Sequence, residues 1–456
     1  MSHSRSRRRA DRRTPAALAA GLAGLTLALS ACGGPSVGAE TSDTASTETT
    51  DWSQVEPASE ITWWSNHPGS SQDVEEQLIA EFEQETGITV NLVTAGANYD
   101  EVAQRFQAAS QTDEKPDLVI ASDVWWFRYH LNDQVMALDD VFDYLDADAD
   151  DFQTTLYDDY EYDGQHWAAP YARSTPLFYY NKTMWAAAGL PDRGPATWDE
   201  LQEWSTALAA QVPDSGSTFG LSLGTSWSAW WFENMLWGQG GQYSDGFDLT
   251  LDSDEAVAGG EFLRDLFHGD DAIATVSADD SMADFASGLI ASTIGSTGSL
   301  KSALDAATFE VGTAYLPDGP EGSGTPTGGT GLAVSSSSTP EKQLAAAMFL
   351  EFLTNTENTS TFSQATGYMP VRTSAVESDT MAAVYDEFPQ FRTAVDQLAE
   401  KARSQDDVRV FVPGADALLT DAIEQIVLEG TDPAEAFAEV TPQIETAYRE
   451  NVEPYL

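Results

Sequence analysis

Short apolar strands alternate with amphipathic helices after residue 58, and this alternation limits the possible folds more than any other feature of the sequence. Segments 61–64, 88–93 and 117–121 have the length and apolar composition of buried strands. The segments between them place apolar residues on one helical face, namely Val74, Leu78, Ile79 and Phe82 in one, and Val102, Phe106 and Ala109 in the other. Repeated strand–helix–strand units predict an α/β fold with parallel sheets and helices on both faces.

Capping residues predict further helices along the chain. Thr197 precedes Asp199 and Glu200 as in a capping box, which predicts a helix over 199–210. The pairs Thr339-Pro340 and Asp432-Pro433 open two more, because proline is favoured in the first turn of a helix. Roughly 400 residues exceed one ordinary hydrophobic core, so two lobes are expected.

The first 31 residues have the pattern of an export signal. Arginines are concentrated before an apolar stretch at 16–29, which is too short to span a bilayer. The stretch ends in Leu29-Ser30-Ala31-Cys32, which is similar to the lipobox of bacterial lipoproteins, where the cysteine carries the lipid. We expect Cys32 to anchor the exported chain at the outer face of the cytoplasmic membrane. The alternative is an ordinary signal peptide that contains a cysteine, and the export route, Sec or twin-arginine, stays open.

Composition narrows the remaining possibilities. Cys32 is the only cysteine, so no disulfide forms within the chain and no thiolate cluster binds metal. Residues 32–57 are poor in large apolar side chains, which predicts a disordered tether. Without residues 1–31, which hold six arginines and one aspartate, the 21 basic and 74 acidic residues become 15 and 73, a net charge near −58. Nucleic acid is not an expected partner, because phosphate contacts need clustered Lys and Arg.

Catalytic motifs are missing, whereas aromatic side chains are grouped. The sequence has no Walker-type loop, no G-x-S-x-G elbow and no H-E-x-x-H pair, and we expect neither a cofactor nor a metal. Trp227, Trp230, Trp231 and Trp237 lie in one stretch rich in Gly and Ser, which we interpret as turn-rich. Amphipathic rings suit a sugar or polyol, and the grouping favours Trp227 and Trp230 as cleft residues. The alternative for each ring is a place in the core.

Three stretches carry a resemblance to a known family. They are 169–182, with Ser174-Thr175-Pro176 and Tyr179-Tyr180-Asn181-Lys182; 295–300, Gly-Ser-Thr-Gly-Ser-Leu; and 366–371, Thr-Gly-Tyr-Met-Pro-Val. By these stretches the chain resembles the family 1 extracellular solute-binding proteins of ABC importers. Within that family it is most similar to the sn-glycerol-3-phosphate and glycerophosphodiester-binding proteins, from Ile61 to about Gly430.

The resemblance implies a two-lobe, periplasmic-binding-protein-like fold (type II), with three crossing segments and the ligand held between the lobes. The expected amino-terminal lobe comprises residues 58–172 plus 333–369, and the carboxy-terminal lobe 173–332 plus 370–456. The family's members are receptors and not enzymes. The implied function is to capture glycerol-3-phosphate or a glycerophosphodiester and deliver it to the transmembrane subunits of an ABC permease.

Carried over by position, the family's ligand contacts fall on Tyr99, Asp123, Ser174, Ser296, Gly329, Tyr368 and Arg409, with Trp227 and Trp230 as a stacking platform. Arg409 lies among apolar residues, so its guanidinium needs an anionic partner, either a phosphate or one of the chain's own carboxylates. Ser296 opens a turn into a helix near Leu300, whose N–H groups favour an anion. Gly329 allows a close approach of the backbone.

Two departures from the family pattern leave the ligand open. Asp123 stands where glycerol-3-phosphate binders carry Glu, and the shorter side chain leaves room for a larger head group such as a glycerophosphodiester. Arg173 stands where a small polar residue is usual, and it either adds a cation against phosphate or binds a sugar hydroxyl or a nearby Asp. The competing hypotheses are the same class of receptor for a neutral mono- or oligosaccharide, and a secreted carbohydrate-active hydrolase.

Overall fold

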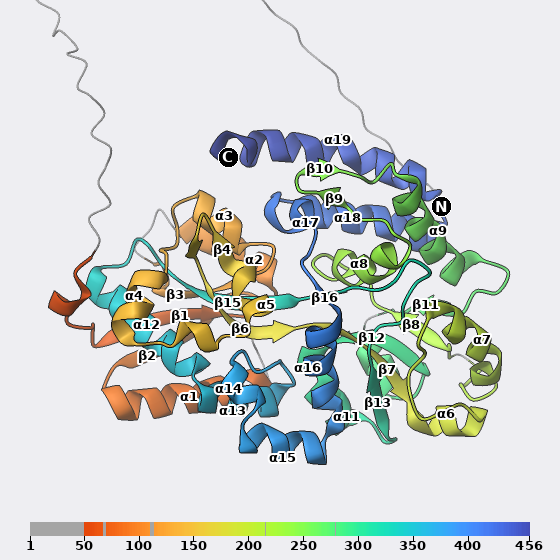
Figure 1. Ribbon diagram of the computed structural model, residues 1–456, viewed down its shortest axis with the longest axis horizontal. Coiled ribbons are helices and arrows are strands. Elements are labelled where there is room, and N and C mark those ends of the chain that lie inside the picture. The colour runs from red at the N-terminus through yellow and green to blue at the C-terminus, as the bar shows by residue number, and fades with distance from the viewer. Residues whose placement is uncertain (1–49, 67–69, 110–113, 215, 279) are drawn as a thin grey trace, which may run out of the picture. The chain divides into compact units, whose positions relative to one another are not determined.

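Two five-stranded sheets, each flanked by helices, organise the protein (Figure 1). The structure is a computed structural model that describes residues 50–66, 70–109, 114–214, 216–278 and 280–456. Cys32, the predicted export signal and most of the predicted tether lie outside these residues. Within the described ranges, no helix has both the length and the apolar composition needed to cross a membrane.

The first sheet combines three strands from the start of the domain with two from later in the chain. Its order is β2 (Thr89–Thr94), β1 (Glu60–Ser65), β3 (Leu118–Ser122), β15 (Gly328–Val334) and β6 (Ala169–Ser174). β1 pairs in parallel with β2 and β3, as the alternating pattern predicts. β15 is antiparallel to β3 and β6, so the sheet is mixed. A parallel strand needs a crossover that returns the chain to the starting end, and β15 arrives without one.

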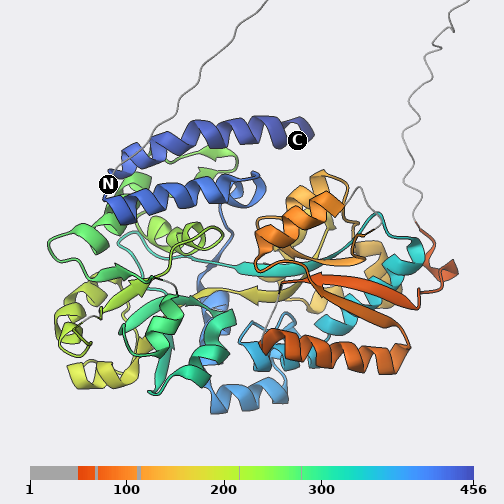
Figure 2. The ribbon, with the colours of Figure 1, turned by 180° about the vertical axis from the view of Figure 1, so that it is seen from behind.

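Helices α1 (Ser70–Thr86) and α2 (Tyr99–Ala109) form where the apolar spacing predicts them. They lie on opposite faces of the first sheet (Figures 1 and 2). Leu78 and Phe82 of α1 and Val102 and Phe106 of α2 are each at most 2% exposed, which confirms the predicted inward faces. α12 (Pro340–Thr354) also packs against this sheet, and α13 (Thr356–Thr366) packs against α1.

The second sheet has the order β11 (Ala274–Val276), β8 (Phe219–Leu221), β12 (Ser292–Ser296), β7 (Pro176–Asn181) and β13 (Val311–Ala314). β11, β8 and β12 are parallel, and β7 is antiparallel to β12 and β13. The longer helices of this part are α7 (Trp198–Ala209), α8 (Ser228–Gly238), α9 (Asp254–His268), α16 (Pro389–Lys401), α18 (Ala415–Glu424) and α19 (Pro433–Asn451). Thr197 caps α7 by accepting from the Glu200 N–H at 3.1 Å, as predicted.

The tryptophan-rich stretch folds as a helix, so its interpretation as turn-rich is wrong. α8 is buried along its whole length because it is apolar on nearly every side. Trp231 and Trp237 are 0% and 3% exposed and belong to the interior, the alternative that their grouping had left open.

Shorter segments link the two sheets. β6 and β7 are separated by Thr175 alone, and β14 (Thr325–Pro326), paired with β16 (Ala402–Arg403), directly precedes β15. A later passage runs through α14 (Thr373–Val376) and α15 (Asp379–Glu387) into α16, which packs against β13. Other short helices are α3 (Trp126–Leu131), α4 (Asp139–Leu145), α5 (Thr154–Tyr157), α6 (Lys182–Ala188), α10 (Ser281–Ala286), α11 (Leu300–Ala306) and α17 (Asp407–Phe411).

Candidate functional site

Adjacent strands of the first sheet bring Asp123, Ser174 and Gly329 together. Asp123 directly follows β3, Ser174 ends β6, and Gly329 lies at the start of β15. The Asp123 N–H donates to the Gly329 carbonyl at 3.2 Å, and Ser174 pairs with Gly328 across the β6–β15 ladder. Three candidates from distant parts of the sequence therefore lie at one end of this sheet.

Gly329 occupies a position that no other residue fits. Its φ is +93°, and a Cβ built on it would lie 2.2 Å from the Ala172 carbonyl oxygen. A side chain would both strain the backbone and collide with β6. The glycine is therefore required for the contact between β15 and β6, whatever it also offers a ligand.

Arg409, on α17, is 1% exposed and contacts carboxylates from two other parts of the chain. Its Nη1 lies 3.5 Å from Oδ2 of Asp123, and its Nη2 lies 3.0 Å from Oδ1 of Asp416. Gln405 joins the first pair, because its amide donates to Asp123 Oδ2 at 3.0 Å and its carbonyl oxygen accepts from Arg409 Nη1. In this structure the anionic partners that Arg409 requires come from the chain itself.

The surroundings keep Arg409 charged in spite of its burial. Burial lowers the pKa of the guanidinium, but Asp416, Asp123 and Glu233 outweigh that effect and raise the pKa above its ordinary value. Glu233 of α8 is fully buried, which raises its pKa well above the usual range, and its Oε1 accepts from the Asp406 N–H at 3.0 Å. A neutral Glu233 thus holds the residue next to Gln405 against α8.

Arg173 is also fully buried and is held by an internal carboxylate. It donates through Nη1 to the Tyr160 hydroxyl at 2.8 Å and pairs through Nη2 with Asp159. Thr327 donates to the same Asp159 oxygen at 2.6 Å. Burial raises the pKa of Asp159, and the charge of Arg173 opposes this rise. The nearby-Asp alternative for Arg173 is the contact observed in this structure.

Tyr99 and Tyr368 meet through their hydroxyls, which are hydrogen-bonded to each other. Tyr99 begins α2, and Tyr368 follows α13 and stacks on Phe362 with ring centroids 5.7 Å apart. Burial raises the pKa of both tyrosines, and the charge of Asp123 raises that of Tyr99 further. Both hydroxyls therefore stay protonated and can donate.

Ser296 ends β12 and uses its side chain within its own turn. Its Oγ accepts from the Gly298 N–H at 3.1 Å, and its carbonyl accepts from the Tyr179 hydroxyl at 2.8 Å. α11 begins at Leu300, where the sequence predicts a helix. A Cβ on Gly298 would lie 2.7 Å from Tyr368 Cζ, so this turn packs directly against Tyr368.

Trp227 and Trp230 are neighbours with different environments. Their ring centroids lie 5.4 Å apart, with planes inclined by 49°. Trp230 is 4% exposed and donates through Nε1 to the Thr327 carbonyl at 2.8 Å, which ties α8 to the segment before β15. Trp227 is half-buried, and its Nε1 has no hydrogen-bond partner among the described residues. Trp230 is therefore fixed by its hydrogen bond, whereas Trp227 keeps part of its ring accessible.

Sequence reasoning missed five residues of this network: Asp159, Tyr160, Thr327, Gln405 and Asp416. The only available signal was indirect, because a buried arginine predicts a carboxylate partner without saying which one. A cavity of about 170 Å³ remains beside the network, lined by residues that include Asp123, Asp159 and Gln405. Pockets that hold drug-sized ligands are about 300–1,000 Å³, so side-chain contacts fill much of the space that such a ligand needs.

A sequence model of the family described as bacterial extracellular solute-binding protein matches residues 77–390. Among curated proteins, the sn-glycerol-3-phosphate-binding periplasmic protein UgpB of Escherichia coli (strain K12) is 27% identical over 360 residues. This match covers 75% of the chain and 81% of that protein.

Solved structures are similar over most of the chain. UgpB from Mycobacterium tuberculosis, in complex with glycerophosphocholine, is 41% identical with a TM-score of 0.82, covering 87% of this chain and all of that one. The GacH receptor of Streptomyces glaucescens, known with acarbose, is 21% identical with a TM-score of 0.75, covering 88% of this chain and all of that one. The second likeness concerns the fold alone.

Proposed function

Because the chain belongs to the bacterial extracellular solute-binding proteins, we propose that it captures a glycerophosphodiester or glycerol-3-phosphate and delivers it to an ABC permease. One observation carries this proposal: 41% identity, over 87% of the chain, to a protein whose structure contains glycerophosphocholine. Receptors that share the fold at 21% identity include maltose- and acarbose-bound proteins, so a neutral saccharide is the alternative ligand.

The site offers complementary groups for a phosphate ester. A phosphate that enters beside Arg409 competes with Asp123 and Asp416 for the guanidinium, which can bind it through two parallel hydrogen bonds. Asp123 then accepts from a glycerol hydroxyl. The accessible face of Trp227 suits C–H groups or a quaternary ammonium, which is attracted to an indole ring.

Calorimetric titration tests the ligand. Glycerophosphocholine, glycerol-3-phosphate and maltose are titrated into wild type, Arg409→Ala and, as a matched control, Arg392→Ala, whose exposed guanidinium pairs with Asp396 at 2.6 Å. We expect Arg409→Ala to weaken phosphate-ester binding at least tenfold, since a charged hydrogen bond contributes about 1.5–3 kcal/mol. Arg392→Ala should bind as wild type does.

A stronger response to maltose than to either phosphate ester would overturn the ligand and leave the class of receptor. Mass spectrometry of the recovered ligand tests the proposal that the protein binds without catalysis, because the competing hydrolase would change it. Thermal melting of Arg409→Ala and Arg409→Lys separates lost binding from lost folding.

Two broader proposals concern movement and location. The lobes, with the boundaries predicted above, close around the ligand, because contacts made to both sides favour the closed state. Small-angle scattering should then report a smaller radius of gyration with ligand, and an unchanged radius would contradict closure. Cys32 carries the membrane anchor, so Cys32→Ala should release the exported protein into the medium. Retention of this variant in the membrane fraction would contradict the anchor.

A further inference from the structure

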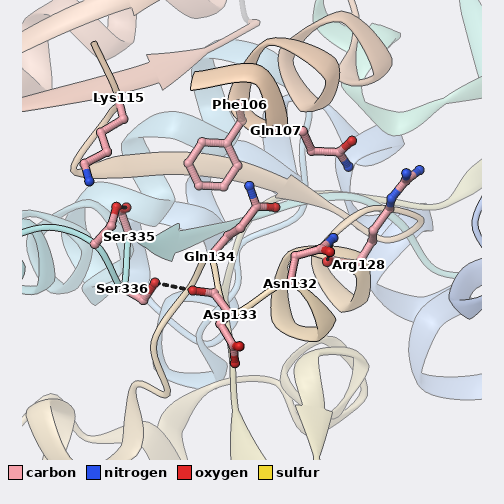
Figure 3. A pocket seen from close by; sticks show the side chains of 10 residues that line it. Phe106, Gln107, Lys115, Arg128, Asn132, Asp133, Gln134, Ser335 and Ser336 are labelled. Carbon is pink, nitrogen blue, oxygen red and sulfur yellow. Dashed lines mark hydrogen bonds between the residues drawn. The ribbon is translucent and has the colours of Figure 1, made fainter. Parts of the chain in front are cut away.

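A second pocket opens on the first sheet's side of the protein, away from the network around Arg409. It has a volume of about 390 Å³ and lies where the end of α2, the segment before β3, the end of α3 and the turn after β15 meet (Figure 3). Its lining comprises Phe106, Gln107, Lys115, Arg128, Asn132, Asp133, Gln134 and Ser335 to Ser337. None of these residues belongs to the site described above.

The cations of this pocket are unusual for so acidic a chain. Lys115 and Arg128 are half-buried, and neither has a carboxylate within ion-pair distance among the described residues. The chain has 74 acidic residues against 21 basic ones, so unpaired cations facing one cavity are not expected by chance. Burial lowers the pKa of Arg128, and the Tyr129 hydroxyl partly opposes this. These two cations remain available to an anion from outside.

The two charges lie on opposite sides of the pocket, with uncharged polar groups between them (Figure 3). Gln134 is 8% exposed, and its Oε1 has no hydrogen-bond partner among the described residues. A buried acceptor without a donor is unfavourable, so it favours a ligand that brings a hydroxyl. Asp133 is the acidic residue of the lining, and its carboxylate points away from Gln134 (Figure 3).

The wall of this pocket is held in place independently of any ligand. Gln343 donates to the Ser335 and Ser336 carbonyls at 3.2 and 3.0 Å, and the Ser336 hydroxyl donates to the Asp133 carbonyl at 2.5 Å. The Gln134 N–H donates to the Tyr129 carbonyl at 2.9 Å. The polar groups are therefore positioned before binding, which lowers the entropy cost of capturing a ligand.

We propose that this pocket is a second binding site for a small organic dianion with a hydroxyl group, whose acidic ends pair with Lys115 and Arg128 and whose hydroxyl donates to Gln134. Hydroxy-dicarboxylates have this chemistry. The volume of about 390 Å³ accommodates such a molecule. The site is separate from the proposed capture of a phosphate ester, and both can be filled at once.

Titration calorimetry on the full chain tests the site with malate, succinate and lactate as probes. Malate has two carboxylates and a hydroxyl, succinate lacks the hydroxyl, and lactate lacks one carboxylate. We expect malate to bind best and lactate at least tenfold more weakly, because one charged hydrogen bond is lost. Lys115→Gln and Arg128→Gln should each weaken malate binding at least tenfold.

The matched control is Arg449→Gln, which removes an exposed cation of α19 that also lacks a carboxylate partner among the described residues and should leave malate binding unchanged. Arg409→Ala should also leave it unchanged. Absent malate binding, or malate binding that survives both pocket substitutions, overturns the proposal. Loss of malate binding in Arg409→Ala overturns it as well, because the anion then occupies the other site. Thermal melting of each variant, with Arg128→Lys as the conservative change, shows whether a lost signal is lost folding.

Discussion

The cations around Asp123 and those of the outer pocket differ in what neutralises them. Arg173 and Arg409 are at most 1% exposed, and each has a carboxylate partner from elsewhere in the chain. Lys115 and Arg128 are half-buried and have no such partner among the described residues. A fully buried charge must be paired within the protein, whereas a half-buried one can rely on water.

This difference has a consequence for binding. A ligand beside Arg409 must compete with Asp123 and Asp416 for the guanidinium, so part of its interaction energy replaces contacts that already exist. An anion at Lys115 and Arg128 displaces only water. The first arrangement makes selectivity depend on rearrangement of side chains, and the second makes it depend on charge and size.

The largest expected effect is on the stability of the buried network. Arg409→Met leaves Asp123 and Asp416 buried without a cation, and we expect a loss of about 3–5 kcal/mol in the free energy of unfolding. Urea denaturation followed by circular dichroism measures it. Arg392→Met, which removes an exposed and paired arginine, is the control and should change stability little. Equal effects of the two substitutions would remove the distinction between the buried and exposed cations.

The next effect concerns the backbone that brings Asp123 to the network. Gly329→Ala adds a Cβ 2.2 Å from the Ala172 carbonyl oxygen at a φ of +93°, and we expect a loss of about 2–4 kcal/mol. Gly246 also has a positive φ, +57°, but has open space around it. Gly246→Ala should therefore cost only about 1–2 kcal/mol, and thermal unfolding of both variants isolates the contact with β6.

A smaller effect is expected from pH. Burial raises the pKa of Asp406 to about 6, well above that of an exposed aspartate. The folded protein therefore binds this proton more tightly than the unfolded chain, and the stability that it contributes is present at pH 4 and lost as pH rises through about 6. Over this range we expect Asp406 to change stability by about 1–3 kcal/mol.

Urea midpoints of wild type and Asp406→Asn between pH 4.5 and 7.5 isolate this contribution. The difference between the two proteins should shrink or reverse toward higher pH. A difference that does not vary with pH would show that Asp406 titrates normally in the folded state.

The smallest expected effect lies in the outer pocket. Lys115→Gln and Arg128→Gln remove charges that have no partner among the described residues, so each should change the free energy of unfolding by no more than about 0.5 kcal/mol. Urea denaturation with and without malate measures it. A large loss without malate would mean that these cations serve the fold and not a ligand.

The local patterns of the chain were predictable because they depend on neighbours in sequence. The apolar spacing of 74–82 and 102–109 places α1 and α2, and Thr197 marks the start of α7, since helix faces and caps are decided within a few residues. The tryptophan-rich stretch was misinterpreted because Gly and Ser at its edges suggest turns. Burial on every side is what stabilises α8 there.

The sequence by itself determined the alternating α/β pattern, the family through the motifs around Ser174, Ser296 and Tyr368, and the requirement for a counter-charge at Arg409. Only the tertiary structure decided which carboxylates meet that requirement. Asp123 and Asp416 lie 286 residues before and seven after Arg409, among 74 acidic residues that are alike in sequence. Long-range pairing depends on which strand ends and helices are brought together, and one carboxylate cannot be told from another until the sheets are assembled. The unpaired cations of the outer pocket were hidden for the same reason, since a missing partner is a property of the fold.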